Sequence, residues 1–139
     1  MTYCVDASAA VRFLIPTPGT EAAQPFWWQA LRDGERLVAP PLLLAETTSV
    51  IRRCAYNDFV VHEEAIAAVR LLLSLPIEID RRIEQYEDAL DFANRLGQSK
   101  AYDVQYLAVA RLNDCPIVTA DRTLAAVAGT LNIRSQLIA

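Results

Sequence analysis

Short runs of apolar residues alternate along the chain with longer segments whose apolar positions recur every three or four residues. The short runs predict β-strands at Thr2–Val5, Arg36–Ala39, Ile77–Ile79, Pro116–Thr119 and Asn132–Arg134. The periodic segments predict helices over Ala7–Ile15, Thr20–Arg32, Pro40–Tyr56, His62–Ser74, Glu84–Leu96, Ser99–Leu112 and Arg122–Gly129. This alternation is typical of an α/β fold with a mainly parallel central sheet, here of about five strands flanked by helices.

Three helix boundaries carry recognisable signals. Pro40 and Pro41 suit a first helical turn, because proline lacks an N–H that this turn leaves unpaired. Gly97 predicts a left-handed cap that ends the fifth helix. Ser99 predicts an N-cap for the sixth helix, which places Asp103 near its first turn, where the helix dipole favours an anion.

Length and composition indicate one compact domain over residues 1–139. The chain is 53% apolar with only four glycines, and no apolar run approaches the length of a membrane span; Leu71–Leu75, for example, is short and stopped by Pro76. Neither a signal peptide nor a transmembrane segment is recognisable. The three cysteines have no paired spacing, so we expect reduced, buried thiols in a cytoplasmic protein.

The net charge of −4 argues against non-specific binding of polyanions, which is typical of basic proteins. The distribution of charge changes this picture, because several cations lie within a few residues of the acids considered next. These cations are Arg12, Arg52, Arg53, Lys100 and Arg122.

Four acidic residues occupy positions that are unusual for acids. Asp6 and Asp121 follow buried strands, and the carboxyl ends of parallel strands are where ligands bind. Glu46 and Asp103 interrupt apolar helix faces, where an unpaired carboxylate costs several kcal/mol. If the four converge at one sheet edge, they repel one another unless a divalent cation such as Mg²⁺ or Mn²⁺ lies among them.

Each acid also has a simpler interpretation. Asp6, Asp103 and Asp121 are all candidates for helix caps, and Glu46 could pair with Arg52 or another arginine. The single histidine, His62, is expected at the surface. No catalytic triad, P-loop or dinucleotide-binding motif is present.

Four motifs together resemble the PIN-domain nucleases, and most closely the VapC-type toxins of bacterial toxin–antitoxin pairs. The motifs, which span nearly the whole chain in order and spacing, are Val5-Asp6-Ala-Ser8-Ala9, Leu44-Ala-Glu46, Tyr102-Asp103-Val-Gln-Tyr106-Leu-Ala-Val-Ala110 and Val118-Thr-Ala-Asp121-Arg122. The tract between about Tyr56 and Gly97 carries no motif of this family.

The resemblance implies a Mg²⁺- or Mn²⁺-dependent enzyme that cleaves single-stranded RNA, forms a homodimer and binds a cognate antitoxin. It assigns Asp6, Glu46, Asp103 and Asp121 as catalytic and metal-binding residues. Ser8 and Thr119 match polar positions that support this cluster by hydrogen bonds. The products would be a 5′-phosphate and a 3′-hydroxyl.

Three cations close to these acids, Arg12, Lys100 and Arg122, are candidates for contacts with RNA phosphates, although they could equally be solvated surface charges.

The segment Phe26-Trp27-Trp28 is a candidate partner-binding site. Trp27 shares a helical face with other apolar residues, whereas Trp28 lies about 100° away around the helix. We therefore expect a large aromatic side chain to be exposed or covered by a partner such as the antitoxin, unless the helix is buried on two sides.

Two other function classes remain open. A catalytically silent PIN-like module would bind protein or RNA without cutting it. An aspartyl-phosphate phosphatase or a receiver domain would also use strand-end acids, but Asp6 lacks the paired Asp-x-Asp motif of such phosphatases, and no lysine follows a late strand.

Overall fold

The computed structural model describes all of residues 1–139 and has a five-stranded parallel sheet at its centre. The strands lie in the order β3-β2-β1-β4-β5, and every neighbouring pair is parallel, as expected for the predicted fold class. Their bounds are β1 Thr2–Val5, β2 Arg36–Ala39, β3 Ile77–Ile79, β4 Ile117–Thr119 and β5 Ser135–Leu137.

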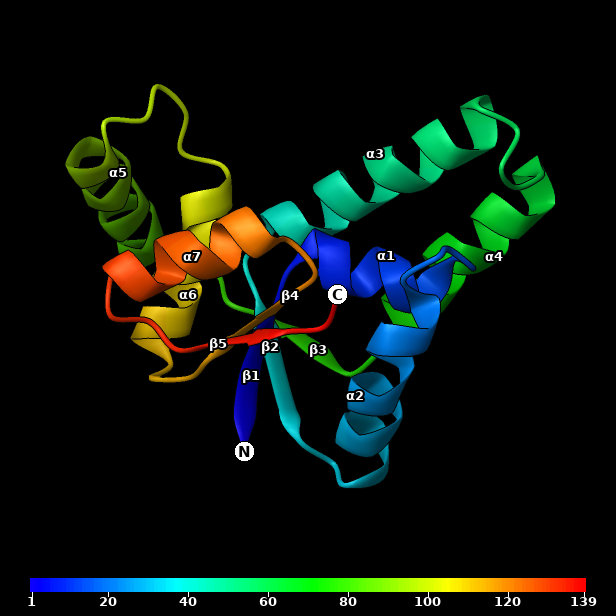
Figure 1. The fold of residues 1–139 in the computed structure, drawn as a ribbon, viewed down its shortest axis with the longest axis horizontal. Coiled ribbons are helices and arrows are strands. Elements are labelled where there is room, and N and C mark those ends of the chain that lie inside the picture. Colours follow the sequence, from blue (N-terminus) through cyan, green and yellow to red (C-terminus); the bar gives the residue numbers. More distant parts are fainter.

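Seven helices connect and cover these strands. They are α1 Ala7–Leu14, α2 Thr20–Arg32, α3 Leu42–Tyr56, α4 His62–Ser74, α5 Glu84–Leu96, α6 Asp103–Leu112 and α7 Arg122–Thr130. Figure 1 shows α5, α6 and α7 on one side of the sheet and α1, α2 and α4 on the other, with α3 and α4 forming a hairpin that extends away from the strands. None of these helices combines the length and the apolar character needed to cross a membrane.

The core lies between the sheet and the helices on both of its faces. Val5, the last residue of β1, and Val118, the middle residue of β4, are fully buried, as expected for a parallel sheet covered on both sides. Helix α6 packs across β1, β2 and β4 and is buried nearly all round from Val104 to Ala110. Cys4 and Cys115 are buried and Cys54 is partly buried, all as free thiols.

Two predicted boundaries are wrong. Helix α6 begins at Asp103 and not near Ser99, which lies exposed in the preceding loop. The last strand is Ser135–Leu137 and not Asn132–Arg134. The apolar signal came from Ile133, which is buried in the turn before the strand, whereas the edge strand itself is exposed and polar.

The order of the strands creates a topological switch point next to β1. The chain leaves β1 towards β2 on one side, while β4 pairs with β1 on the other side. Crevices at the carboxyl ends of strands at such a point are the usual ligand sites of open parallel sheets. Asp6 directly follows β1, and Asp121 follows β4 two residues after its last residue, Thr119.

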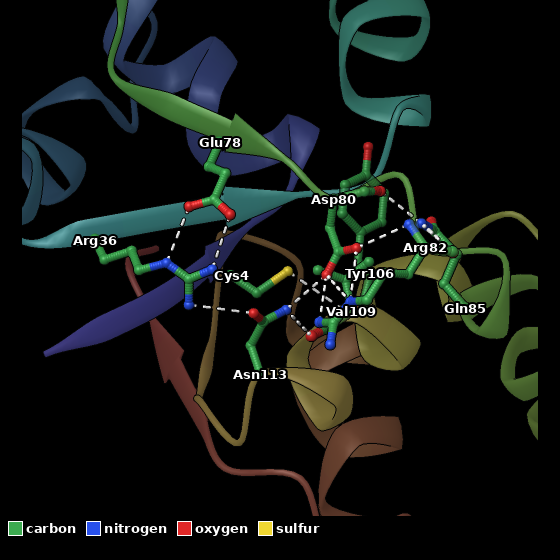
Figure 2. Close-up of polar contacts among 9 residues, drawn as sticks. All are labelled: Cys4, Arg36, Glu78, Asp80, Arg82, Gln85, Tyr106, Val109 and Asn113. Atoms are coloured by element: carbon green, nitrogen blue, oxygen red, sulfur yellow. Dashed lines mark hydrogen bonds and ion pairs between the residues drawn. The ribbon is translucent and has the colours of Figure 1, made fainter.

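A third strand-end acid, Asp80, follows β3 and was not singled out by the sequence. Its carboxylate accepts bonds from the Arg82 guanidinium at 2.6–3.1 Å and from the Asn113 amide at 3.0 Å. Figure 2 shows this cluster, in which Asn113 also accepts a bond from Arg36, itself paired with Glu78. Hydrogen bonds from Arg82 lower the pKa of Asp80 to about 2, so this acid is a charge-compensated structural group.

We expect Asp80→Asn to destabilise the protein at neutral pH by about 2 kcal/mol, because the pKa of Asp80 falls from 3.8 to about 2 on folding. A depressed pKa contributes stability above pH 3.8 that is lost as the pH falls towards 2. Urea unfolding of wild type and variant at several pH values measures this. The difference in free energy of unfolding between wild type and variant should be constant from pH 7 to 5 and should disappear as the pH falls below 4. A difference that is independent of pH would contradict the assignment.

Candidate acidic site

Asp6 is buried at the start of α1, and protein hydrogen bonds fix its carboxylate. Its Oδ1 accepts bonds from the Ala9 backbone N–H at 2.9 Å and the Ser8 hydroxyl at 2.7 Å, while its Oδ2 accepts one from the Thr119 hydroxyl at 2.5 Å. Ser8 also accepts a bond from the Ala120 backbone N–H, which ties α1 to the end of β4. Ser8 and Thr119 therefore lie where the sequence places them, against Asp6.

Asp121 caps α7 with one oxygen and leaves the other free. Its Oδ1 accepts bonds from the backbone N–H groups of Thr123 at 2.8 Å and Leu124 at 3.2 Å. The simpler interpretation as a helix cap is thus correct for both Asp6 and Asp121. Capping does not exhaust either carboxylate, since an ionised carboxylate accepts about four hydrogen bonds. Asp103, in the first turn of α6, accepts none from the protein.

Glu46 lies on α3, partly buried, with its Oε1 3.3 Å from the hydroxyl of Tyr106, which donates to it. Tyr106 comes from the buried face of α6 and is itself only 1% exposed. It therefore connects the two helices that carry Glu46 and Asp103. Glu46 forms no ion pair with Arg52 or any other cation, so the alternative of a core salt bridge is wrong.

The four acids interact electrostatically through space. Desolvation by the surrounding protein is the main cause that raises the pKa of Asp6, which is buried, and of Glu46 and Asp103, which keep part of their contact with water. Charge repulsion adds to each: from Asp121 on Asp6 and on Asp103, and from Asp103 and Asp6 on Glu46. Three acids at helix starts and Glu46 in the second turn of α3 thus form one connected cluster of negative charge.

No side-chain cation offsets this cluster by a direct contact. The ion pairs of the structure involve Arg32, Arg36, Arg82, Arg95, Arg111 and the N-terminal amine, and none of them includes the four acids. A neighbouring negative charge disfavours the ionised form of a carboxylate, which explains the upward contribution to each of these pKa values. The contrast with Asp80, whose guanidinium partner lowers its pKa, shows that the chain can supply such a partner elsewhere.

The donor set suits a hard divalent cation. All the candidate ligand atoms are carboxylate oxygens, which Mg²⁺ and Mn²⁺ prefer, and free oxygens remain on Glu46, Asp103 and Asp121. As the side chains lie, no three His, Cys, Asp or Glu residues are grouped closely enough to enclose an ion. Mg²⁺ is commonly held by only one or two carboxylates and completes its shell with water, so the residues fit this group.

Two clefts open on the cluster and share Glu46. The first, of about 530 Å³, is lined by Glu46, Gln98, Ser99, Lys100, Tyr102 and Asp103. The second, of about 450 Å³, lies between α1, the loop after it and α3, and contains Ser8, Arg12, Gly19 and Arg53. Glu46 therefore lies between two concave surfaces, of which the first carries Lys100 and the second carries Arg12 and Arg53.

The cations that the sequence singled out flank this site without carboxylate partners. Arg12 lies against Gly19, where an added Cβ would be 1.5 Å from its Nη1, and it makes no ion pair. Lys100 lines the first cleft, and Arg122 directly follows Asp121 at the start of α7. Sequence reasoning assigned Arg53, Tyr102 and Tyr106 no role in the site, although both tyrosines lie within one of the quoted motifs and Arg53 lies near Glu46.

The aromatic segment on α2 divides as its helical spacing predicts. Trp27 is fully buried, stacks on Phe13 and donates its indole N–H to the Ala9 carbonyl at 3.0 Å. Phe26 is also buried, whereas Trp28 is 59% exposed. Only Trp28 is therefore free to contact a partner.

Comparison with known proteins places this geometry in a family. The chain matches the model of the PIN domain over residues 3–130. It belongs to the PIN domain family. The match spans all four acids, and it confirms the resemblance seen in the sequence motifs.

Relatives of this PIN domain include toxins and toxin–antitoxin complexes. Ribonuclease VapC1 of Mycobacterium tuberculosis is 36% identical over 92 residues, 66% of this chain and 67% of the relative. The crystal structure of M. tuberculosis VapC20, a toxin that cleaves the sarcin-ricin loop, aligns with a TM-score of 0.70 at 20% identity, covering 89% of this chain and 93% of that one. VapBC2 of Rickettsia felis, bound to a promoter DNA fragment, aligns with a TM-score of 0.73 at 14% identity, covering 99% and 98%.

We expect Asp103→Asn to raise the thermal stability of this PIN domain in the absence of metal, because it removes a charge that repels Glu46 and Asp121. Since Asp103 is exposed, the rise in Tm should be small, about 1–3 °C. Added Mn²⁺ should raise the Tm of the wild type more than that of the variant.

Asp91→Asn is the matched control, because Asp91 is an exposed aspartate that pairs with Arg95 on α5. Its response to Mn²⁺ should equal that of the wild type. A wild-type protein that Mn²⁺ does not stabilise would contradict a metal site at the four acids.

Proposed function

We propose that this PIN domain is a metal-dependent endoribonuclease that hydrolyses phosphodiester bonds in single-stranded RNA, and that it is the toxin of a toxin–antitoxin pair. The observation that carries the proposal is a cluster of four acids at the sheet's switch point with no cation among them. The similarity to a relative named as a ribonuclease supports RNA as the substrate.

In this proposal Asp6, Glu46, Asp103 and Asp121 hold Mg²⁺ or Mn²⁺. A bound ion of this kind acts as a Lewis acid on a phosphoryl oxygen and lowers the pKa of a coordinated water. The charge that develops on phosphorus in phosphodiester hydrolysis is the charge such a site is suited to stabilise.

The surrounding side chains orient the acids. Ser8 and Thr119 donate to Asp6 and favour the ionised form of its carboxylate, since these hydrogen bonds oppose the rise in its pKa that burial causes. Tyr106 donates to Glu46 and fixes one of its oxygens. Arg12, Lys100 and Arg122 contact the phosphates of the RNA on either side of the acids and hold the strand in register.

A catalytically silent PIN-like module remains the alternative. It would keep the basic clefts and bind RNA or protein. Binding alone does not require four neighbouring acids, whose mutual repulsion destabilises the fold. The retention of all four acids without an offsetting cation favours the nuclease.

We expect the purified protein to cut single-stranded regions of total cellular RNA in the presence of Mn²⁺ and to lose this activity when the metal is chelated. Asp6→Asn should reduce the cleavage rate by at least about 100-fold, because it removes charge from the centre of the cluster. Gel analysis of product RNA over time measures both effects. Cleavage that survives chelation, or a variant as active as the wild type, would argue against the metal mechanism; binding without cleavage would favour the silent module.

The partners proposed for this chain are a cognate antitoxin and a second copy of the chain, and the proposed location is the cytoplasm. Solved structures with the same fold include toxin–antitoxin complexes. The exposed Trp28, next to the buried Phe26 and Trp27, is the part of the aromatic segment that a partner can cover.

Trp28→Ala should leave the fold intact and weaken the complex with the antitoxin by about 10-fold or more, because large aromatic side chains often dominate binding energy. Titration calorimetry against the cognate antitoxin measures the affinity, and thermal unfolding checks the fold. Leu73→Ala, at an exposed apolar position on α4, is a control of similar exposure. An unchanged affinity for Trp28→Ala would remove this residue from the interface.

A further inference from the structure

The first of the two clefts contains an aromatic side chain that has no structural partner. Tyr102 precedes α6, is 59% exposed, and lines the cleft together with Lys100 and Asp103. It makes no hydrogen bond as a helix cap and no contact with another aromatic ring. The neighbouring Tyr106, by contrast, is buried and donates to Glu46.

The cleft has the composition of a site for one nucleotide. Its volume of about 530 Å³ lies within the range of about 300–1,000 Å³ that is usual for small ligands. Lys100 supplies a positive charge without a carboxylate partner, and Gln98 and Ser99 supply polar groups that can bond to the edge of a base. Glu46 and Asp103 form the wall that faces the acid cluster.

The exposed position of Tyr102 is not explained by the stability of the fold. Gly97 takes the left-handed conformation (φ 65°) and ends α5, after which the loop Gln98–Tyr102 returns to the carboxyl edge of the sheet before α6 begins. This loop leaves Tyr102 exposed, although burying an aromatic ring normally stabilises a fold. An exposed ring beside a cation and next to the proposed reaction centre is typical of single-stranded nucleic acid sites, where bases stack on aromatic side chains.

We infer that Tyr102 is the stacking platform for a nucleobase of the RNA strand, next to the bond that is cut, and that Lys100 contacts the phosphate of the same nucleotide. This inference rests on the proposed function. The second cleft, which shares Glu46 and carries Arg12 and Arg53, receives the strand on the other side of the acids. The RNA thus crosses the acid cluster from a base-binding cleft to a phosphate-binding cleft.

Binding of three labelled dodecamers separates stacking from phosphate contacts. The probes are A12, U12 and a dodecamer of abasic ribose phosphates, measured by fluorescence anisotropy with Ca²⁺ in place of the catalytic ion. Tyr102→Ala should weaken binding of A12 by about 5- to 150-fold, weaken U12 less because pyrimidines stack more weakly, and leave the abasic probe unchanged. Tyr102→Phe should restore binding of A12.

Two variants serve as controls. Tyr86→Ala removes a tyrosine of comparable exposure on α5, outside the cleft, and should bind every probe as the wild type does. Lys100→Ala should weaken binding of all three probes alike and reduce the slope of log K against log salt by about 0.7, the value for one phosphate of a single strand.

The outcomes distinguish this inference from the proposed function. Two outcomes would overturn only the inference, provided that the wild type cuts RNA. In the first, Tyr102→Ala binds A12 as tightly as the wild type does. In the second, Tyr102→Ala loses as much affinity for the abasic probe as for A12, so Tyr102 does not stack on a base. Because every base has a face for stacking, a wild type that binds neither A12 nor U12 more tightly than the abasic probe also overturns the inference. A wild type that neither binds nor cuts any RNA overturns both.

Discussion

Mutual repulsion among four carboxylates is the constraint on which the site depends. Alongside the effect of desolvation, the charge of Asp121 raises the pKa values of Asp6 and Asp103, and the charges of Asp103 and Asp6 raise the pKa of Glu46. No arginine or lysine forms an ion pair with any of the four. Such an arrangement lowers the stability of the folded chain at neutral pH. Asp80 shows the alternative within the same molecule, because its contacts with Arg82 and Asn113 make a strand-end acid stabilising.

The fold brings the repelling groups together by means of its topology. The carboxyl ends of β1 and β4 are adjacent at the switch point, so the caps of α1 and α7 meet there, and Ser8 and Thr119 link them through Asp6. Helix α6 packs across the sheet so that its first turn, with Asp103, lies at the same edge. The two clefts on either side then make the acid cluster accessible to a long, anionic substrate.

Much of the fold could be predicted from the sequence because a parallel sheet buried on both faces produces short apolar strands separated by periodic helices. The exceptions have physical causes. The edge strand Ser135–Leu137 is exposed, so it has no apolar signature. The loop before Asp103 is predicted to be helical because its residues are compatible with a helix. Its place in the wall of the cleft depends on tertiary structure, which the local sequence does not specify. The acids could be found as misfits in apolar surroundings, but Tyr106 and Arg53 could not, since an apolar helix face and a surface cation are ordinary features in sequence.

The most direct test of the account is the position of a bound ion. Crystals soaked in Mn²⁺ give an anomalous difference signal that locates the metal independently of activity. The account predicts a peak at the carboxyl edge of β1 and β4, with oxygens of at least two of Asp6, Glu46, Asp103 and Asp121 at about 2.1 Å. No peak there, or Mn²⁺ bound only at other surface acids such as Glu63 and Glu64, would contradict it.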